Sequence, residues 1–430
     1  MDLEIVTIGD ELLLGFTIDT NAAHLARELS ALGIRIVRRT TSGDEPASIA
    51  SAVRDALDRT GAVITTGGLG PTADDRTKPA IAGLFGQEMI MNDAILEALE
   101  ARWLKRFGHQ LPVSNRQQAM VPERATILAN GHGSAPGIWL EDERGRWVAM
   151  LPGVPREMRG MLADTIMPLL RNRAGATAGA TATVVRSCTL RTANISESAL
   201  ADRLGEYARG VLGWPLAFLP GNDGVDLRVT VMGLPAADAD EVLMQAAALL
   251  RERAGTVVYG EGDDDLAALV LATCIERNAT IAVAESCTGG LLGGRLTAVP
   301  GSSRVFEGGV IAYSNAVKTR ELGVSATDLE ANGAVSEAVA RAMAAGVRAR
   351  FGSSIGIGIT GIAGPDGGSI EKPVGTVWVG IDVEGAVHAV RAVLPGNRNE
   401  IRYRGTQLAL DRLRRTFARD AASPGWATQA

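Results

Sequence analysis

The order in which short apolar runs alternate with helical patterns constrains the fold of this chain most strongly. Residues 3–8 form a short apolar run, which is the pattern of a strand buried in a parallel sheet, and residues 34–38 and 62–66 are predicted to be the second and third strands. A helical pattern separates each strand from the next, and the glycine-rich residues 67–70 directly follow the third. Two consecutive strand–helix–strand units predict a doubly wound α/β sheet, with any ligand at the carboxyl ends of its strands.

The rest of the chain divides into two further predicted domains. After the doubly wound domain at residues 1–170, the small, aperiodic stretch 171–182 indicates a linker. Residues 183–257 contain two strand patterns and two helix patterns, which predict a small α+β domain. Residues 258–418 again alternate strands and helices and predict a second α/β domain, and residues 421–430 are expected to fray.

The composition argues against several classes of protein. The 430-residue chain has four His and three Cys and no C-x-x-C or H-E-x-x-H spacing, which argues against a structural zinc site and a disulfide framework. A formal charge of −6 argues against binding to DNA or anionic lipid through a global positive field. No run reaches the ~18 apolar residues that a membrane helix needs, and the acidic start does not resemble a signal peptide. We therefore expect a cytoplasmic protein with no membrane partner.

A turn between a predicted strand and a predicted helix carries the strongest candidate chemistry. Residues 284–290 read AESCTGG, so Ser286 lies at the carboxyl end of a strand and just ahead of a helix predicted at 288–296. Helix N–H groups would converge above Ser286, and Gly289 and Gly290 would let a ligand approach the backbone closely. This arrangement suits a nucleophile with an oxyanion site. The alternative is that Ser286 is only a helix N-cap.

The base that Ser286 would need has few candidates in this domain. His388 is its only histidine and lies more than 100 residues downstream in a predicted strand. Tyr313 ends another strand and Lys318 follows one helical turn later; both can activate a serine if burial lowers the pKa of the lysine. The alternative is that Lys318, near the start of a short surface helix, is solvated. Cys287 is a competing nucleophile, although as the next residue it should point elsewhere.

A third loop completes the predicted site of this domain. Residues 360–368 follow the strand predicted at 354–359 and are rich in Gly and small polar side chains. Three such loops at strand ends predict a single crevice. Lys372, Arg398 and Arg402 add positive charge that could meet a phosphate.

The ordered motifs of residues 258–417 resemble the C-terminal domain of the CinA (competence/damage-inducible) proteins. In chain order, the motifs are AESCTGG, VPGSS, GGVIAYSN-x-x-K, GAVSE, TGIAGPDGGS-x-EKPVGTV and PGNR. That family is similar to stand-alone nicotinamide mononucleotide (NMN) amidohydrolases. The resemblance implies hydrolysis of the carboxamide of NMN to nicotinate mononucleotide and ammonia, with no cofactor or metal at this site.

The resemblance also implies roles for single residues. Ser286 would be the nucleophile, Tyr313 and Lys318 would carry its proton, and Arg398 or Arg402 would meet the substrate phosphate. Amide hydrolysis needs a nucleophile, a proton carrier and donors for the oxyanion, so the residue types agree with the implied reaction. The other residues implied to contact the substrate are Thr288, Gly289, Gly290, Thr360, Gly361 and Gly364.

The first domain carries motifs of its own at strand ends. Gly67, Gly68 and Gly70 precede a helix and suit phosphate binding. Acidic residues after other strands could gather a hard divalent cation through oxygen ligands, although each Asp could instead be a helix cap. These candidate metal ligands are Asp10, Asp74, Asp75 and Glu157.

Together these N-terminal motifs are similar to the molybdopterin-binding fold of molybdenum-cofactor biosynthesis proteins, in the version found in CinA. The resemblance implies a second activity, an ADP-ribose pyrophosphatase that uses a divalent metal (Mg²⁺, Mn²⁺ or Co²⁺), because a metal that bridges a pyrophosphate fits that chemistry. It does not imply that this chain makes molybdenum cofactor.

The middle segment also resembles CinA, whose linker domain is similar to a KH fold. Residues 210–213 spell the G-x-x-G of an RNA-binding KH loop, but Arg209 is the only basic residue beside it. We interpret the segment as a spacer and expect no nucleic-acid partner, while the resemblance favours a homodimer. The rival hypothesis for the whole chain is a non-enzymatic protein, a nucleotide sensor or a competence-associated interaction protein, that uses the same crevices for binding.

Overall fold

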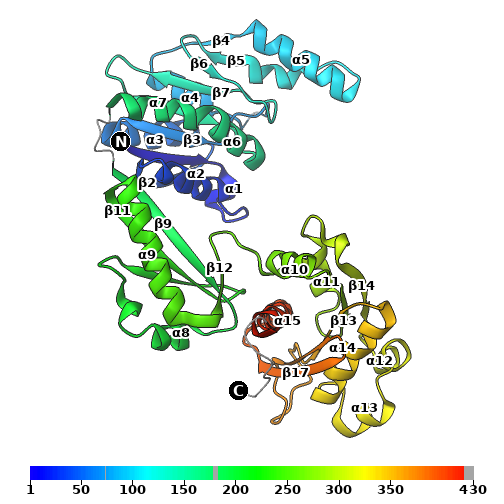
Figure 1. Cartoon of the computed structure of the whole chain (residues 1–430). Helices are drawn as coiled ribbons and strands as arrows, with labels where there is room; N and C mark the ends of the chain where they lie inside the picture. Colours follow the sequence, from blue (N-terminus) through cyan, green and yellow to red (C-terminus); the bar gives the residue numbers. More distant parts are fainter. Residues whose placement is uncertain (73, 178–182, 421–430) are drawn as a thin grey trace. The chain divides into compact units, whose positions relative to one another are not determined.

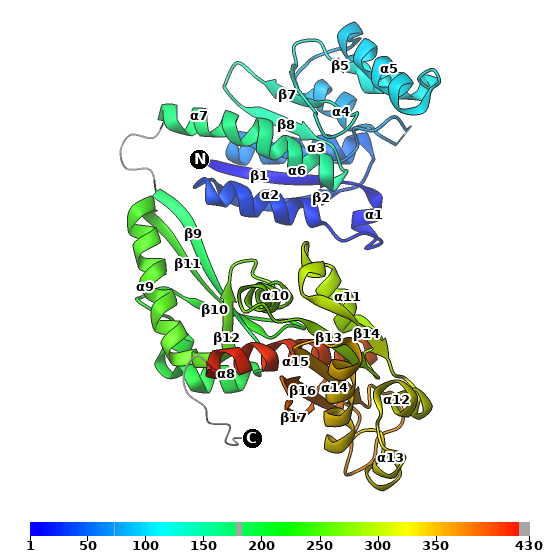
Figure 2. The same ribbon diagram turned by 45° about the vertical axis from the view of Figure 1, so that its right-hand side comes forward.

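The structure is a computed structural model that describes residues 1–72, 74–177 and 183–420. The described chain forms two compact units (Figures 1 and 2). The first comprises the described residues of Met1–Arg186 together with Val231–Val242, and the second comprises the other described residues. Within the described residues, no helix is long and apolar enough to cross a membrane.

A six-stranded sheet forms the centre of the first unit. Its order is β2-β1-β3-β8-β7-β6. The first four strands are parallel to one another, β7 is antiparallel to β8, and β6 is antiparallel to β7. Alternate residues of β1 pack on opposite faces: Leu3 and Ile5 lie in the cluster that contains helix α2, and Val6 and Ile8 in the cluster that contains α3. The predicted doubly wound fold is therefore confirmed. The elements are β1 (Asp2–Ile8), α1 (Asp10–Leu13), α2 (Thr20–Ala31), β2 (Arg35–Ser42), α3 (Pro46–Thr60), β3 (Ala62–Thr66), α4 (Thr77–Leu84), β6 (Thr126–Leu128), β7 (Gly137–Glu141) and β8 (Trp147–Leu151).

A small extension and a long helical segment complete this unit. β4 (Met89–Met91) and β5 (Met120–Pro122) pair with each other, and α5 (Asp93–Phe107) lies between them in the chain. Helix α6 (Pro155–Met161) continues through a π-helical turn (Leu162–Ile166) into α7 (Met167–Thr177).

The linker predicted at residues 171–182 is wrong for its first part, which is helical. Arg173 explains the extension, because its guanidinium pairs with Glu141 at 2.7 Å and lies 5.4 Å from the ring centre of Trp139. The remaining linker residues, 178–182, and the predicted frayed end, 421–430, lie outside the described residues.

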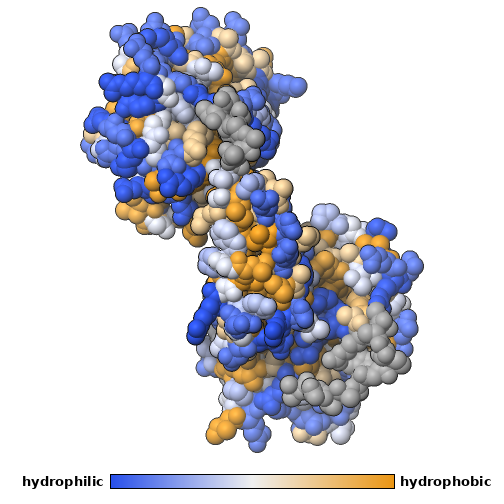
Figure 3. Space-filling model, turned by 60° about the vertical axis from the view of Figure 1, so that its left-hand side comes forward, coloured by the Kyte–Doolittle hydropathy of each residue, from blue (hydrophilic) through white to orange (hydrophobic). Residues whose placement is uncertain are grey.

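The middle segment has a four-stranded sheet of order β10-β11-β9-β12 with α8 and α9. This α+β class matches the prediction, although β10 and β12 were not predicted because both are short. Figure 3 shows apolar side chains on the surface of this segment, where Met244 of α9 is 67% exposed. The bounds are β9 (Thr183–Thr192), α8 (Glu197–Leu204), β10 (Leu216–Pro220), β11 (Val225–Pro235), α9 (Ala236–Ala254) and β12 (Val258–Glu261).

The C-terminal domain is a five-stranded sheet of order β14-β13-β15-β16-β17 with helices on both faces. β14, β13 and β15 are parallel, so their carboxyl ends meet at one edge. Gly358 and Gly380 let α14 approach the sheet, because a Cβ at either would lie within 2.7 Å of the Ala340 carbonyl oxygen. The elements are α10 (Leu266–Glu276), β13 (Ile281–Glu285), α11 (Leu291–Thr297), β14 (Phe306–Ile311), α12 (Asn315–Leu322), α13 (Ala326–Asn332), α14 (Glu337–Phe351), β15 (Ile355–Gly361), β16 (Thr376–Val383), β17 (Ala386–Val393) and α15 (Arg398–Asp420).

Candidate active site

Ser286 begins a tight turn at the end of β13. Its N–H donates to the Ile359 carbonyl of the neighbouring strand β15 at 2.9 Å, and its own carbonyl accepts from Gly289 N–H at 3.1 Å. Gly289 and Gly290 have φ of 59° and 93°, in the left-handed region that favours glycine. The turn thus fixes Ser286 at the sheet edge, with the residue only 8% exposed.

Glu285 changes the expected use of the helix N–H groups. Its buried carboxylate accepts hydrogen bonds from Gly290 N at 3.1 Å, Leu292 N at 3.0 Å and Gly293 N at 2.8 Å. The helix begins at Leu291 rather than near residue 288, and Glu285 takes up its first N–H groups. The expectation that these groups converge above Ser286 is therefore wrong. The N–H groups of Cys287 and Thr288 donate neither to Glu285 nor to a backbone carbonyl of the described residues, and both lie close enough to the Cys287 sulfur to act on it as hydrogen-bond donors.

Lys318 is the side chain that reaches Ser286. Its Nζ lies 3.1 Å from Ser286 Oγ, 2.9 Å from the Ala312 carbonyl oxygen and 3.2 Å from the Tyr313 carbonyl oxygen. Lys318 is 1% exposed, and this burial lowers its pKa from the usual value. The alternative of a solvated surface lysine is wrong, because the carbonyls that precede α12 enclose the ammonium.

Tyr313 does not join this pair through its hydroxyl. The residue is 61% exposed, and its Oη accepts a hydrogen bond from Arg398 Nη2 at 3.2 Å. Within the described residues, the only hydrogen bond between Tyr313 and the Ser286–Lys318 pair is accepted by its backbone carbonyl. The structure therefore places Lys318, and not the Tyr313 hydroxyl, where it could take the proton of Ser286.

Two arginines at the start of α15 hold the neighbouring loops. Arg398 Nη1 donates to the Gly364 carbonyl at 2.6 Å, and Arg402 Nη2 donates to the Thr288 carbonyl at 2.9 Å. Thr288 is fully buried, and its Oγ1 has no hydrogen-bond partner among the described residues. Both arginines are thus brought to the Ser286 turn and its neighbouring loop, and each keeps further N–H groups for a substrate.

The remaining predicted residues of this site are packed rather than open. Thr360 is 1% exposed and its hydroxyl donates to the Ala334 carbonyl at 2.8 Å. A Cβ at Gly361 would lie 2.8 Å from the Thr376 carbonyl oxygen and 3.1 Å from Cys287 Sγ, so only glycine fits there. Burial raises the pKa of Cys287 to about 12, which keeps it a thiol and a poor nucleophile.

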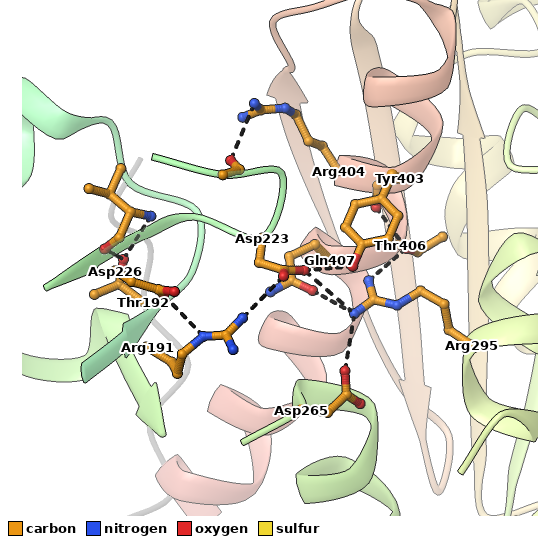
Figure 4. A network of polar contacts seen from close by, with 12 residues as sticks. Arg191, Thr192, Asp223, Asp226, Asp265, Arg295, Tyr403, Arg404, Thr406 and Gln407 are labelled. Atoms are coloured by element: carbon orange, nitrogen blue, oxygen red, sulfur yellow. Dashed lines mark hydrogen bonds and ion pairs between the residues drawn. The ribbon is translucent and has the colours of Figure 1, made fainter. Parts of the chain in front are cut away.

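The middle segment is joined to α11 and α15 by a network of polar side chains (Figure 4). Asp223, in the loop between β10 and β11, accepts from Tyr403 Oη at 2.7 Å and pairs with Arg191 at 3.1 Å. Arg295 of α11 donates to two side chains of α15 at 2.9 Å and lies 4.6 Å from the ring centre of Tyr403. The segment that the sequence indicated to be a spacer therefore contacts the helices that flank the Ser286 turn.

Helix α15 makes a second contact with the middle segment further along. Asn194 Nδ2 donates to Asp411 Oδ2 at 2.9 Å, and Arg414 Nη2 donates to the Thr256 carbonyl at 2.6 Å. Ala193 is fully buried within the hydrophobic cluster of the C-terminal domain. The middle segment and the C-terminal domain thus share both polar contacts and part of a core.

The N-terminal candidate site is a cavity of about 270 Å³ at the strand ends of the first unit. Gly67 and Gly68 line it, with φ of 111° and 67°, and a Cβ on Gly68 would lie 2.0 Å from Thr77 Oγ1. Gly70 lies beside this cavity, against the Asp75 carboxylate. Gly67 and Gly68 thus line the cavity at the predicted place, whereas Gly70 is not among its lining residues.

The four predicted metal ligands are not brought together. Asp74 and Asp75 line this cavity, whereas Asp10 exchanges hydrogen bonds with Asp44. Glu157 lines a different cavity, where Asn130 Nδ2 donates to its carboxylate at 2.6 Å. Among the described residues, no group of three or more His, Cys, Asp or Glu could hold a metal ion. The predicted four-ligand cluster is wrong in this structure, because α6 carries Glu157 away from the loop of Asp74.

Sequence reasoning missed two side chains that shape the site. Glu285 stands in the AESCTGG motif directly before Ser286, so the signal was present although its role as a cap was not recognised. Arg295 lies in α11 with no sequence signal, because its partners come from α15 more than 100 residues later.

Comparison with known proteins follows the same division of the chain. Residues 4–172 match the family described as "Probable molybdopterin binding domain", residues 187–260 match "Damage-inducible protein CinA KH domain", and residues 263–417 match "CinA C-terminal domain". A "CinA-like protein" of Gemmatimonas aurantiaca is 74% identical, with 100% of each chain covered. Another, of Gloeobacter violaceus, is 44% identical over 96% of each chain.

Among solved structures, the competence damage-inducible protein A of Klebsiella pneumoniae is 34% identical. The match covers 36% of this chain and 95% of that one, with a TM-score of 0.35. The identity to full-length relatives and the order of the three matched domains lead to one conclusion: the chain belongs to the CinA family.

Proposed function

We propose that the C-terminal domain hydrolyses the carboxamide of nicotinamide mononucleotide to nicotinate mononucleotide and ammonia. The observation that carries the proposal is the buried Lys318 Nζ, 3.1 Å from Ser286 Oγ at the carboxyl end of β13. A serine and a desolvated lysine form a nucleophile–base pair that needs no histidine.

The contacts of Lys318 suit the neutral amine. A neutral amine has two N–H groups and one lone pair. The carbonyls of Ala312 and Tyr313, at 2.9 and 3.2 Å, can take the two N–H groups. In that state the lone pair can face Ser286 Oγ, 3.1 Å away, and burial, which lowers the pKa of Lys318, makes loss of the third proton easier.

The reaction can be written with these groups. Ser286 Oγ attacks the carboxamide carbon while its proton passes to Lys318 Nζ, which gives a tetrahedral oxyanion. The C–N bond then breaks, and the leaving nitrogen takes the proton from Lys318 and departs as ammonia. Water, deprotonated by Lys318, attacks the resulting ester. The C–O bond to Ser286 then breaks, the acid is released, and Ser286 Oγ takes the proton back from Lys318.

Other groups of the turn fit the remaining needs of this reaction. The N–H groups of Cys287 and Thr288 follow the nucleophile and donate neither to Glu285 nor to a described backbone carbonyl, so they are our candidates for the oxyanion donors. Arg398 and Arg402 are our candidates for the phosphate, since guanidinium groups bind phosphate in bidentate geometry.

Ammonia release from NMN by the full-length chain tests the proposal. We expect release by the unaltered protein, with Ser286→Ala and Lys318→Met each reduced by at least about 10²-fold, because each loses half of the nucleophile–base pair. Ser325→Ala is the matched control, since it removes a serine hydroxyl that only caps α13 in the same domain. Full turnover in Ser286→Ala would refute the assigned nucleophile, and NMN binding without ammonia release would favour the nucleotide-sensing alternative.

An ADP-ribose pyrophosphatase at the N-terminal cavity has less support. Its glycine turn suits a pyrophosphate, but the described residues form no cluster of three metal ligands, so we derive no metal-dependent step. ADP-ribose hydrolysis assayed with Mg²⁺, Mn²⁺ and Co²⁺ tests this activity.

A further inference from the structure

The first unit contains a second cavity, of about 500 Å³, which the sites above do not use. One face of α5 lines it with Arg102, Trp103, Arg106 and Phe107. The loop at residues 131–134 and the start of α6 complete its walls. A volume of this size lies within the range of about 300–1,000 Å³ that is typical of small-molecule sites.

The charge of this cavity is opposite to that of the whole chain. Three arginines line it, Arg102, Arg106 and Arg156, against the single carboxylate of Glu157. The chain as a whole has a net charge of −6, so this is a local concentration of positive charge. Neither Arg106 nor Arg156 forms an ion pair with a described residue, which leaves both guanidinium groups available to an anion.

Two aromatic rings stand beside these arginines. The ring centres of Trp103 and Phe107 are 4.5 Å apart, and Arg106 lies 5.2 Å from the centre of the Phe107 ring. Phe107 is 48% exposed, so this aromatic pair is accessible from solvent. Arginine and aromatic faces together are the surfaces on which nucleobases stack.

One loop separates this cavity from the glycine-lined one. Gly153 and Pro155 line the glycine-lined cavity, whereas Val154, Arg156 and Glu157 line the basic one. The Glu157 carboxylate accepts a hydrogen bond from Asn130, and Glu157 is not among the residues that line the cavity of Asp74 and Asp75. The two cavities are therefore distinct sites within one compact unit.

We propose that the basic cavity binds a phosphorylated compound with a planar heteroaromatic ring, of the mononucleotide class. Arg106 and Arg156 bind its phosphate, and Trp103 and Phe107 contact its ring. This site is independent of the amidohydrolase proposed for the C-terminal domain, since it lies in the other compact unit.

Calorimetric titration of the full-length chain with AMP tests the proposal, with adenosine and ribose 5-phosphate as probes that each carry half of the chemistry. We expect AMP to bind more tightly than either half. Arg106→Gln combined with Arg156→Gln should weaken AMP binding at least about tenfold, and Phe107→Ala should weaken AMP and adenosine but not ribose 5-phosphate. Arg54→Gln is the matched control, because Arg54 is an exposed arginine of α3 in the same unit.

The readouts separate this site from the others. AMP affinity that is unchanged in the double variant would overturn the proposal, because binding would then belong to another cavity. Ammonia release from NMN should be unaffected by the double variant, so failure of the amidohydrolase proposal leaves this test intact. If the substitutions at Arg106, Arg156 and Phe107 instead change the sedimentation of the chain and AMP does not bind, the face is a contact between copies, and the proposal is wrong.

Discussion

Replacement of Glu285 by Gln should destabilise the C-terminal domain by about 1–4 kcal/mol. The carboxylate is 1% exposed and accepts three backbone N–H groups. A glutamine offers one oxygen, which accepts two of them, so its NH₂ group faces the third N–H. An unsatisfied buried donor costs about 1–3 kcal/mol, and loss of the charge at a helix start adds about 0.3–1 kcal/mol.

Urea denaturation followed by far-UV circular dichroism measures this change as a lower midpoint. Glu307→Gln is the matched control, since Glu307 is an exposed residue of β14. It should change the free energy of unfolding by less than about 0.5 kcal/mol. A Glu285→Gln midpoint within that same margin would refute the reasoning, because it would mean that the three N–H groups do not depend on the carboxylate.

Three further predictions concern charged groups that are buried or half-buried. Ammonia release should rise with pH through the pKa of Lys318, because the neutral amine is the base. Burial places this pKa below the usual lysine value. A rate that does not depend on pH across that titration would contradict this role. Asp223→Asn should reduce the free energy of unfolding of the second unit by about 1–3 kcal/mol, because it weakens the contacts to Arg191 and Tyr403. The urea midpoint should fall accordingly, and an unchanged midpoint would show that the network adds no stability. Burial lowers the pKa of Lys78 to about 8, whereas in the unfolded chain this lysine keeps its proton up to about pH 10.4. The free energy of unfolding of the first unit should therefore rise by roughly 3 kcal/mol as the pH increases between these two values. Urea midpoints at pH 7.5 and 10 measure this gain, which should be absent in Lys78→Met.

The fold could be predicted because its signals are local. The apolar run at residues 3–8 and the glycine turn at 67–70 are each complete within a few residues. The alternation of such runs with helices leaves few topologies, since parallel crossovers are right-handed. The extension of α7 could not be predicted, because it depends on Arg173 pairing with Glu141, 32 residues away.

The candidate site could be predicted only in part. Residue types at strand ends placed Ser286, Thr360 and the arginines of α15 near one another, since parallel strands end at one edge. The burial of Lys318 depends on the path of the backbone at residues 312–313, which no spacing encodes. The same is true of the exposed hydroxyl of Tyr313. The homodimer and the cytoplasmic location stay predictions.

Helix α15 fixes the number of residues between two sets of contacts, one made by Arg402 and one made by Asp411. Arg402 reaches the Thr288 carbonyl, and Asp411, nine residues later, accepts from Asn194 of the middle segment. Inserting or deleting one residue between them would turn one set of contacts by about 100° relative to the other. Residues 403–410 are all buried or half-buried, so this stretch is constrained in its length as well as in its side chains. Single-residue insertions and deletions should therefore not accumulate along it.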